Sequence, residues 1–130
     1  MLVTVTKSDS WAVPRIDLDP KFNYKIGVRR LNFKILSSNL EQNQLICLKS
    51  TVVDLSSGNP LQSLEFVTYD SSVQIQSFCP SVVCYHPVQL RNLTDASFDL
   101  IDPWSEHEIL FSNFFLQLEI LRHDSYGRIF

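Results

Sequence analysis

Residues 114–122 constrain the fold of this chain more than any other segment, because their side chains alternate in character with a period of two. One face would carry Phe114, Leu116, Leu118 and Ile120, and the opposite face is mixed. A helix would instead need apolar residues spaced three and four apart with a polar back. The segment is therefore predicted to be a β-strand with one buried face.

The residues before this strand predict a second strand and a turn. Residues 96–102 also alternate, which favours a half-buried strand. Asp102 and Pro103 would end it, because proline lacks an N–H and the aspartate side chain can bond to the backbone that follows it. Residues 93–122 are thus expected to form a strand, a turn and a strand, a hairpin that closes the fold.

Short apolar or alternating segments separated by turn residues occupy most of the remaining chain. Strands are predicted at residues 2–6, 22–36, 45–55, 61–69, 72–79 and 82–85. In the second of these the apolar phase slips by one residue at Arg29-Arg30, which predicts a β-bulge or a bend between sheets. About eight strands with no amphipathic helix are typical of an antiparallel β-sandwich or barrel.

The composition fits one such domain over residues 1–130. Hydrophobic residues make up 45% of the chain and charged residues 19%, enough for a packed core. The N-terminal residues lack the basic lead of a signal peptide, and we expect synthesis in the cytosol without secretion. The three cysteines are an odd number, which argues against a disulfide framework and favours buried free thiols.

Charge is distributed unevenly along the chain. Residues 1–50 hold eight Lys or Arg and four Asp or Glu, a net +4, whereas residues 51–130 hold three and ten, a net −7. This pattern fits an unevenly charged solvated surface. It also fits unlike faces that meet between neighbouring subunits.

The chemistry-bearing residues form no familiar catalytic pattern. There is no Gly-x-Ser-x-Gly elbow, and three glycines are too few for a phosphate-binding loop. Cys79, Cys84 and His86 are the one candidate metal cluster, but the gap between the cysteines is wider than zinc motifs use. We therefore expect no enzyme activity, no cofactor and no metal, and the sequence identifies no small-molecule substrate.

Two stretches resemble a known family. The opening MLVTVTKSDSW with FNYKIGVRRLNFKIL, and the closing strand pattern from Leu100-Ile101-Asp102 to Phe114–Ile120, resemble the small single jelly-roll (penton-type) capsid proteins of Polinton (Maverick) elements and adintoviruses. The resemblance implies a single jelly roll of about eight strands in two sheets, acting as a capsid or vertex subunit. It implies a virion or host-cell cytoplasmic or nuclear location, and no catalytic residues.

On this hypothesis the chain assembles with copies of itself and with other capsid subunits through loops at residues 8–20, 37–44 and 103–107. The candidate contact residues are Trp11, Arg29, Arg30, Trp104 and His107, since Trp and Arg dominate interface hot spots. Trp104 could instead fold back over the sandwich edge. His107, between Glu106 and Glu108, is either a solvated histidine or a mild pH sensor.

Direct nucleic-acid binding is not expected, because no basic arm precedes residues 2–6. No membrane association is expected either, since no apolar run approaches the roughly 18 residues that a span needs. The alternative function is a monomeric β-sandwich module that binds a carbohydrate or a peptide.

Overall fold

Two long strands form the centre of the larger of two sheets. They are β3 (Asn23–Ile35) and β9 (Phe111–His123), which run antiparallel through most of their length in the computed structural model, where residues 1–37, 39–53 and 63–123 are described. The sheet has the order β2-β1-β9-β3-β6, and β7 also pairs with β3. Its shorter strands are β1 (Leu2–Lys7), β2 (Trp11–Ala12), β6 (Ile75–Phe78) and β7 (Tyr85–Pro87).

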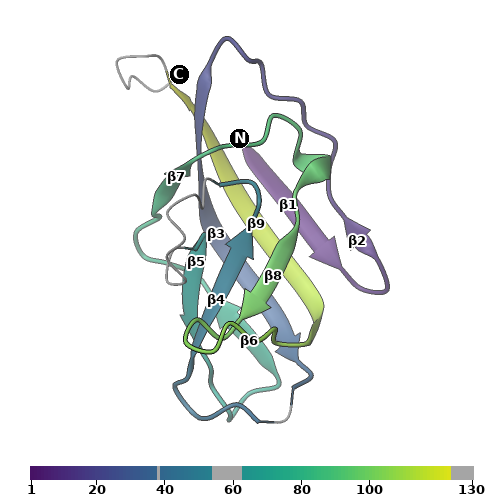
Figure 1. Ribbon diagram of the computed structural model, residues 1–130, viewed down its shortest axis with the longest axis vertical. Helices are drawn as coiled ribbons and strands as arrows, with labels where there is room; N and C mark the ends of the chain where they lie inside the picture. Colours follow the sequence, from purple (N-terminus) through teal and green to yellow (C-terminus); the bar gives the residue numbers. More distant parts are fainter. Residues whose placement is uncertain (38, 54–62, 124–130) are drawn as a thin grey trace.

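The second sheet has three strands and lies in front of the first in Figure 1. Its order is β5-β4-β8, with both pairs antiparallel. The strands are β4 (Leu45–Ser50), β5 (Glu65–Thr68) and β8 (Phe98–Ile101). A single turn of 3₁₀-helix, η1 (Leu93–Asp95), precedes β8 and is capped by the Asn92 side chain, which accepts a hydrogen bond from the Thr94 N–H. The expectation of an all-β antiparallel sandwich is confirmed.

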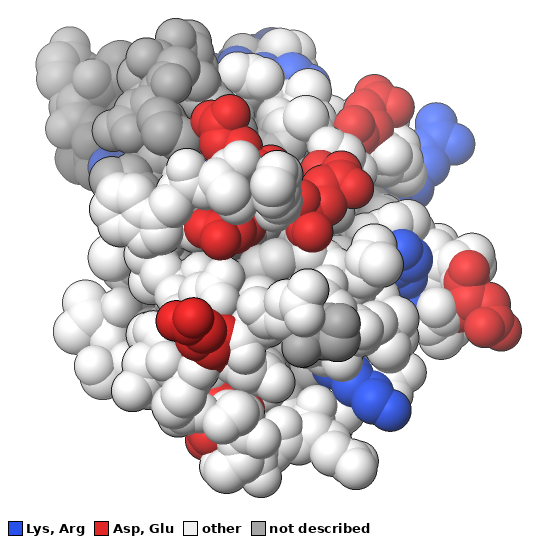
Figure 2. Space-filling view, turned by 60° about the horizontal axis from the view of Figure 1, so that its bottom comes forward, with Lys and Arg blue, Asp and Glu red and all other residues white. Residues whose placement is uncertain are grey.

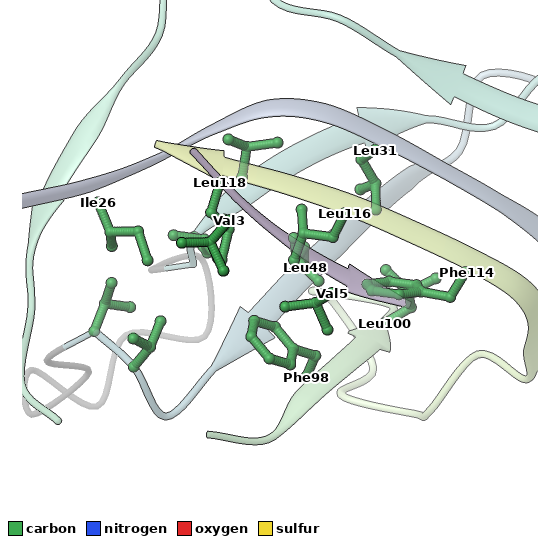
Figure 3. Close-up of a cluster of buried hydrophobic side chains, with 14 of the residues drawn as sticks. Val3, Val5, Ile26, Leu31, Leu48, Phe98, Leu100, Phe114, Leu116 and Leu118 are labelled. Atoms are coloured by element: carbon green, nitrogen blue, oxygen red, sulfur yellow. The ribbon is translucent and has the colours of Figure 1, made fainter. Parts of the chain in front are cut away.

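Apolar side chains from both sheets fill the space between them (Figure 3). The face predicted for the last strand is the buried one: Phe114, Leu116, Leu118 and Ile120 are each at most 3% exposed. Phe98, Leu100 and Leu48 meet them from the smaller sheet. Burial of these side chains is the main source of stability, since each contributes about 1.5–3 kcal/mol when removed from water.

The predicted closing hairpin is wrong. Both strands exist, but β8 lies in the three-stranded sheet and β9 in the six-stranded sheet, so the chain crosses between the sheets after Asp102. A tight turn forms there, in which the Asp102 N–H donates to the His107 carbonyl at 2.9 Å and the Glu106 N–H donates to the Asp102 carbonyl at 2.8 Å. Alternation shows which face of a strand is buried, and it does not show which strand is its neighbour.

The predicted phase slip at Arg29-Arg30 is confirmed as an irregularity in the β3–β9 ladder. The register shifts between Val28 and Arg30 on β3, so the extra residue is Arg29. Ile26 and Val28 on one side of the shift and Leu31 and Phe33 on the other are all fully buried. The bulge therefore keeps every apolar residue of this strand facing the core.

Several predicted elements are shorter in the structure. The strands expected at 45–55, 61–69 and 72–79 correspond to β4, β5 and β6, and residues 54–62 lie outside the described residues. The strand expected at 82–85 is displaced along the chain, because β7 begins at Tyr85. The prediction of buried thiols holds for Cys47 and is wrong for Cys79 and Cys84, which are exposed beside the ends of β6 and β7. In the described part of the chain, no helix has the length and apolar character needed to cross a membrane.

Candidate assembly surfaces

Trp11 lies at one edge of the sandwich and touches both sheets. Its ring centroid is 5.2 Å from that of Phe114 and 6.1 Å from that of Phe111 in the larger sheet, and 5.9 Å from that of Phe98 in the smaller one. The Lys7 Nζ lies 5.2 Å from the centroid of the indole ring, within cation–π range. With 37% of its surface exposed, Trp11 is partly structural and partly available for contact.

Trp104 projects into solvent from the turn that follows β8. Its side chain is 74% exposed, while its N–H donates to Asp102 Oδ1 at 2.9 Å. The neighbouring Pro103 is buried, so the turn is anchored by the proline and presents the indole outward. Trp104 was predicted either to project outward as a contact residue or to fold back over the sandwich edge, and in the structure it projects outward. His107 lies exposed on the same turn.

Three loops from different parts of the chain meet at this end of the sandwich, the lower end in Figure 1. The Gln44 side-chain amide donates to Asp102 Oδ2 at 3.2 Å, which ties the β3–β4 loop to the turn after β8. Gln42 Oε1 accepts from the Ser71 N–H at 2.6 Å, which ties the same loop to the β5–β6 loop. We call these three loops (the described residues 36–37 and 39–44, together with residues 69–74 and 102–110) the loop end.

The loop end carries exposed apolar side chains beside acidic ones. Leu36, Trp104 and Leu110 are each more than half exposed, and the Leu36 N–H donates to the Leu110 carbonyl at 2.8 Å, so two of the three share one site. The acidic residues are Glu41, Asp70, Asp102, Glu106 and Glu108. Figure 2, which turns this end forward, shows acidic side chains across the middle of the face and at its right rim, with basic ones mostly on the right side.

One acidic group of the loop end is held in its charged form. The Ser72 hydroxyl and backbone N–H both donate to Asp70 Oδ1, at 2.6 and 3.0 Å. These bonds, the side-chain one first, lower the pKa of Asp70 below its usual value. The Asp70 carboxylate therefore keeps its negative charge to a lower pH than an unperturbed aspartate does.

Two shallow hollows flank the segment that leads into β9. One, of about 160 Å³, lies beside Trp11, Phe98 and Phe111 and is bordered by Asp99 and Glu108. The other, of about 260 Å³, lies between the β3–β4 loop and the turn with His107. Glu108 and Ile109 line both hollows, so Trp11 and the loop end belong to one continuous surface.

Arg29 lies elsewhere, on the outer face of the larger sheet. The bulge directs its guanidinium onto the Glu119 carboxylate of β9, and the Tyr85 hydroxyl donates to Glu119 Oε1 at 3.0 Å. The hydrogen bond from Arg29, the largest cause, lowers the pKa of Glu119, and the same bond raises the pKa of Arg29. Burial, followed by the bond to Glu119, raises the pKa of Tyr85.

The candidate residues therefore fall into two groups. Trp11, Trp104 and His107 lie on the continuous surface that includes the loop end. Arg29 and Arg30 lie on β3, where Arg29 is engaged in an ion pair within the chain and Arg30 is exposed. Sequence reasoning did not pair Arg29 with Glu119 or Tyr85, because 90 residues separate the arginine from its carboxylate and no local pattern links them.

In the described residues, no group of three or more His, Cys, Asp or Glu side chains could hold a metal ion. Comparisons with models of protein families, with curated protein sequences and with solved structures gave no significant match.

Proposed function

We propose that this protein is a structural subunit that assembles with copies of itself, of the kind found in viral or virus-derived capsids and vertices, and that its sandwich is a single jelly roll. The observation that carries the proposal is the order of the strands in the two sheets. Fold alone does not fix function. The strand order favours a jelly roll among the possible β-sandwich folds. The exposed loop end is the surface proposed for assembly.

A jelly roll of eight strands pairs its first strand with its last, its third with its sixth and its fourth with its fifth. With β2 set aside as an addition to the edge of β1, and β7 as an addition to the edge of β3, the strands here pair in the same way: β1 with β9, β3 with β6, and β4 with β5. In both sheets the order follows, as β1-β9-β3-β6 and β8-β4-β5. This agreement supports a jelly roll.

The remaining pair of a jelly roll joins its second strand to its seventh. Here the chain after β2 approaches the segment that leads into β8: the Leu18 N–H donates to the Arg91 carbonyl at 2.7 Å, and the Leu93 N–H donates to the Ile16 carbonyl at 3.2 Å. Asp17 and Asn92 form an isolated antiparallel bridge between these bonds. The second strand of a jelly roll would thus be reduced to residues 16–18.

The loop end is well suited to contact between subunits. Jelly-roll subunits meet through loops and edges, and exposed Trp side chains dominate such contacts. An acidic end favours an approach to basic side chains of a neighbouring copy, and the exposed Arg30 on the outer face of the larger sheet is one such side chain. Such a contact joins unlike surfaces and generates rings or filaments.

A monomeric module that binds carbohydrate is the second candidate, since lectin domains also use jelly rolls. The hollow beside Trp11 favours it, because aromatic rings and the carboxylates of Asp99 and Glu108 line one site. The indole packs against three phenylalanine rings, however, which leaves a small platform for a sugar ring.

Light scattering of the purified chain over a range of concentration and salt, with negative-stain images of each species, separates these functions. The proposed subunit gives discrete rings or shells whose formation weakens as salt screens the charged contacts. A 15.0 kDa monomer under all conditions would overturn self-assembly, and screening of glycans would then test the second candidate.

A further inference from the structure

One edge of the larger sheet, along strand β1, is open over most of the length of that strand. β1 pairs with β9 on one side over all of its residues, whereas β2 covers only Thr6 and Lys7 on the other side. Beyond that point no backbone partner is present for β1 in the described residues. An open strand edge is a template for pairing with another strand.

The register shows which backbone groups face this edge. Met1 and Ile120 exchange both of their backbone hydrogen bonds, at 2.9 and 2.8 Å. Because bonded and non-bonded pairs alternate in an antiparallel ladder, Val3 and Val5 also bond to β9. The N–H and C=O groups of Leu2 and Thr4 therefore point away from β9, toward the open edge.

Two other edges of the sheets are protected by proline or by backbone pairing, whereas residues 2–5 of β1 carry no such protection of their own. β7 ends in Pro87, which cannot donate a ladder bond, and β8 is partly covered where the Ile109 N–H donates to the Leu100 carbonyl at 2.8 Å. Proline, lysine and bulges are the features that usually prevent an edge strand from pairing with another chain, and residues 2–5 have none of them.

We propose that this edge pairs with the same edge of a second copy, antiparallel about a two-fold axis at Val3. In this register Leu2 of one copy faces Thr4 of the other, and the reverse. The N–H and C=O of Leu2 in one copy then bond to the C=O and N–H of Thr4 in the other, because the backbone polar groups of both residues point toward the open edge. A two-fold contact of this kind uses one patch twice.

Side chains on the outer face also fit this arrangement. Leu2 is 59% exposed, a large apolar side chain left in solvent at the open edge. Beside Thr4 lies an open hollow of about 320 Å³, lined by Thr4, Thr6, Ala12, Val13 and Pro14. The proposed register brings Leu2 of each copy against this hollow of the other, and no charged side chain of residues 2–6 opposes the approach.

This inference extends the proposed assembly by naming one of its contacts, and it is tested separately from that assembly. Cys79→Ser and Cys84→Ser first remove the exposed native thiols. Copies with Leu2→Cys are then mixed with copies that carry Thr4→Cys, and a mild oxidant is added. The mixture should give a cross-linked dimer in at least tenfold excess over either variant alone. Thr68→Cys, at an exposed end of β5, replaces Thr4→Cys in the control.

Thr4→Pro removes an N–H that points toward the open edge, and it removes no hydrogen bond to β9. In sedimentation velocity this variant should therefore lose the dimer that forms through the β1 edge. Leu2→Glu tests the same contact without a change in the backbone and should have the same effect. Equal cross-linking of the Thr4 and Thr68 variants would overturn the inference, even if the wild-type chain assembles. Rings or shells that persist with both Thr4→Pro and Leu2→Glu would also overturn it, and would leave the proposed function intact.

Discussion

Gly27 on β3 lies directly against the carbonyl oxygen of Cys84. A Cβ at Gly27 would be 2.8 Å from that oxygen and 3.0 Å from Cδ1 of Tyr85, and it would also overlap Cγ1 of Val83. The chain entering β7 thus crosses β3 so closely that only glycine fits. The contact fixes where β7 joins the sheet, and it thereby places the Tyr85 hydroxyl on Glu119.

Gly27→Ala should lower the free energy of unfolding by about 1–3 kcal/mol, because the added methyl group must displace backbone as well as side chains. A urea titration followed by tryptophan fluorescence measures this change as a lower midpoint. Thr68→Ala, at an exposed strand end, is the control and should lie within about 0.5 kcal/mol of wild type.

Adding Val83→Ala to Gly27→Ala should restore part of the lost stability and not all of it. The second substitution removes the overlapping side chain, but the Cys84 carbonyl remains in place. An unchanged midpoint for Gly27→Ala alone would show that the backbone at Cys84 can move away from β3 at little cost.

The ion pair between Arg29 and Glu119 should make stability depend on acid pH. The pKa of Glu119 is lower in the folded state, so its contribution is present above the unfolded-state value of about 4.3 and is lost as pH falls through the folded-state value. Because the Arg29 side chain is 46% exposed, solvent screening keeps the contribution small.

Comparison of wild type with Glu119→Gln isolates this contribution. The difference in Tm should be greatest above pH 5 and should shrink as pH falls below about 4.3, where the unfolded chain takes up a proton that the folded carboxylate resists. A Tm difference that stays constant from pH 7 to pH 3 would mean that the charge of Glu119 is not what stabilises the fold.

Trp104→Ala should lower assembly without lowering thermal stability, because the indole is 74% exposed and its anchoring bond comes from the backbone. Light scattering and thermal unfolding on the same sample check the two effects. Trp11→Ala is the matched variant and should lower stability by about 1–3 kcal/mol, since it removes three ring contacts. Loss of stability with Trp104→Ala would place Trp104 in the core.

The three cysteines should react with an alkylating reagent in two classes. Cys79 and Cys84 are exposed and should be modified in the folded protein, whereas Cys47 is buried on β4. Burial also raises the pKa of the Cys47 thiol, which reduces its thiolate fraction further. Intact-mass spectrometry should find two modified sites in the native state and three in urea. Three rapid modifications without denaturant would contradict the placement of β4.

Period-two alternation predicted the strands and their buried faces well. It identified the inward face of β9 and, through the phase slip at Arg29-Arg30, the irregularity in β3. A strand sends successive side chains to opposite faces, so the order of apolar and polar residues shows directly which face is buried. The loop that carries both Trp104 and His107 was likewise predictable from Asp102 and Pro103, which act on the backbone next to them.

The partners of each strand were not predictable in the same way. The sequence placed residues 96–102 and 114–122 in one hairpin, whereas the fold assigns them to different sheets. Pairing between distant strands depends on how whole faces pack. The same dependence decided that Arg29 meets Glu119, that the β7 chain crosses Gly27 and that the outer edge of β1 stays open. By itself the sequence determined which residues form strands and which sides are buried, because these follow from neighbours along the chain. The tertiary structure alone decided which surfaces remain exposed, because these follow from contacts between residues far apart in sequence.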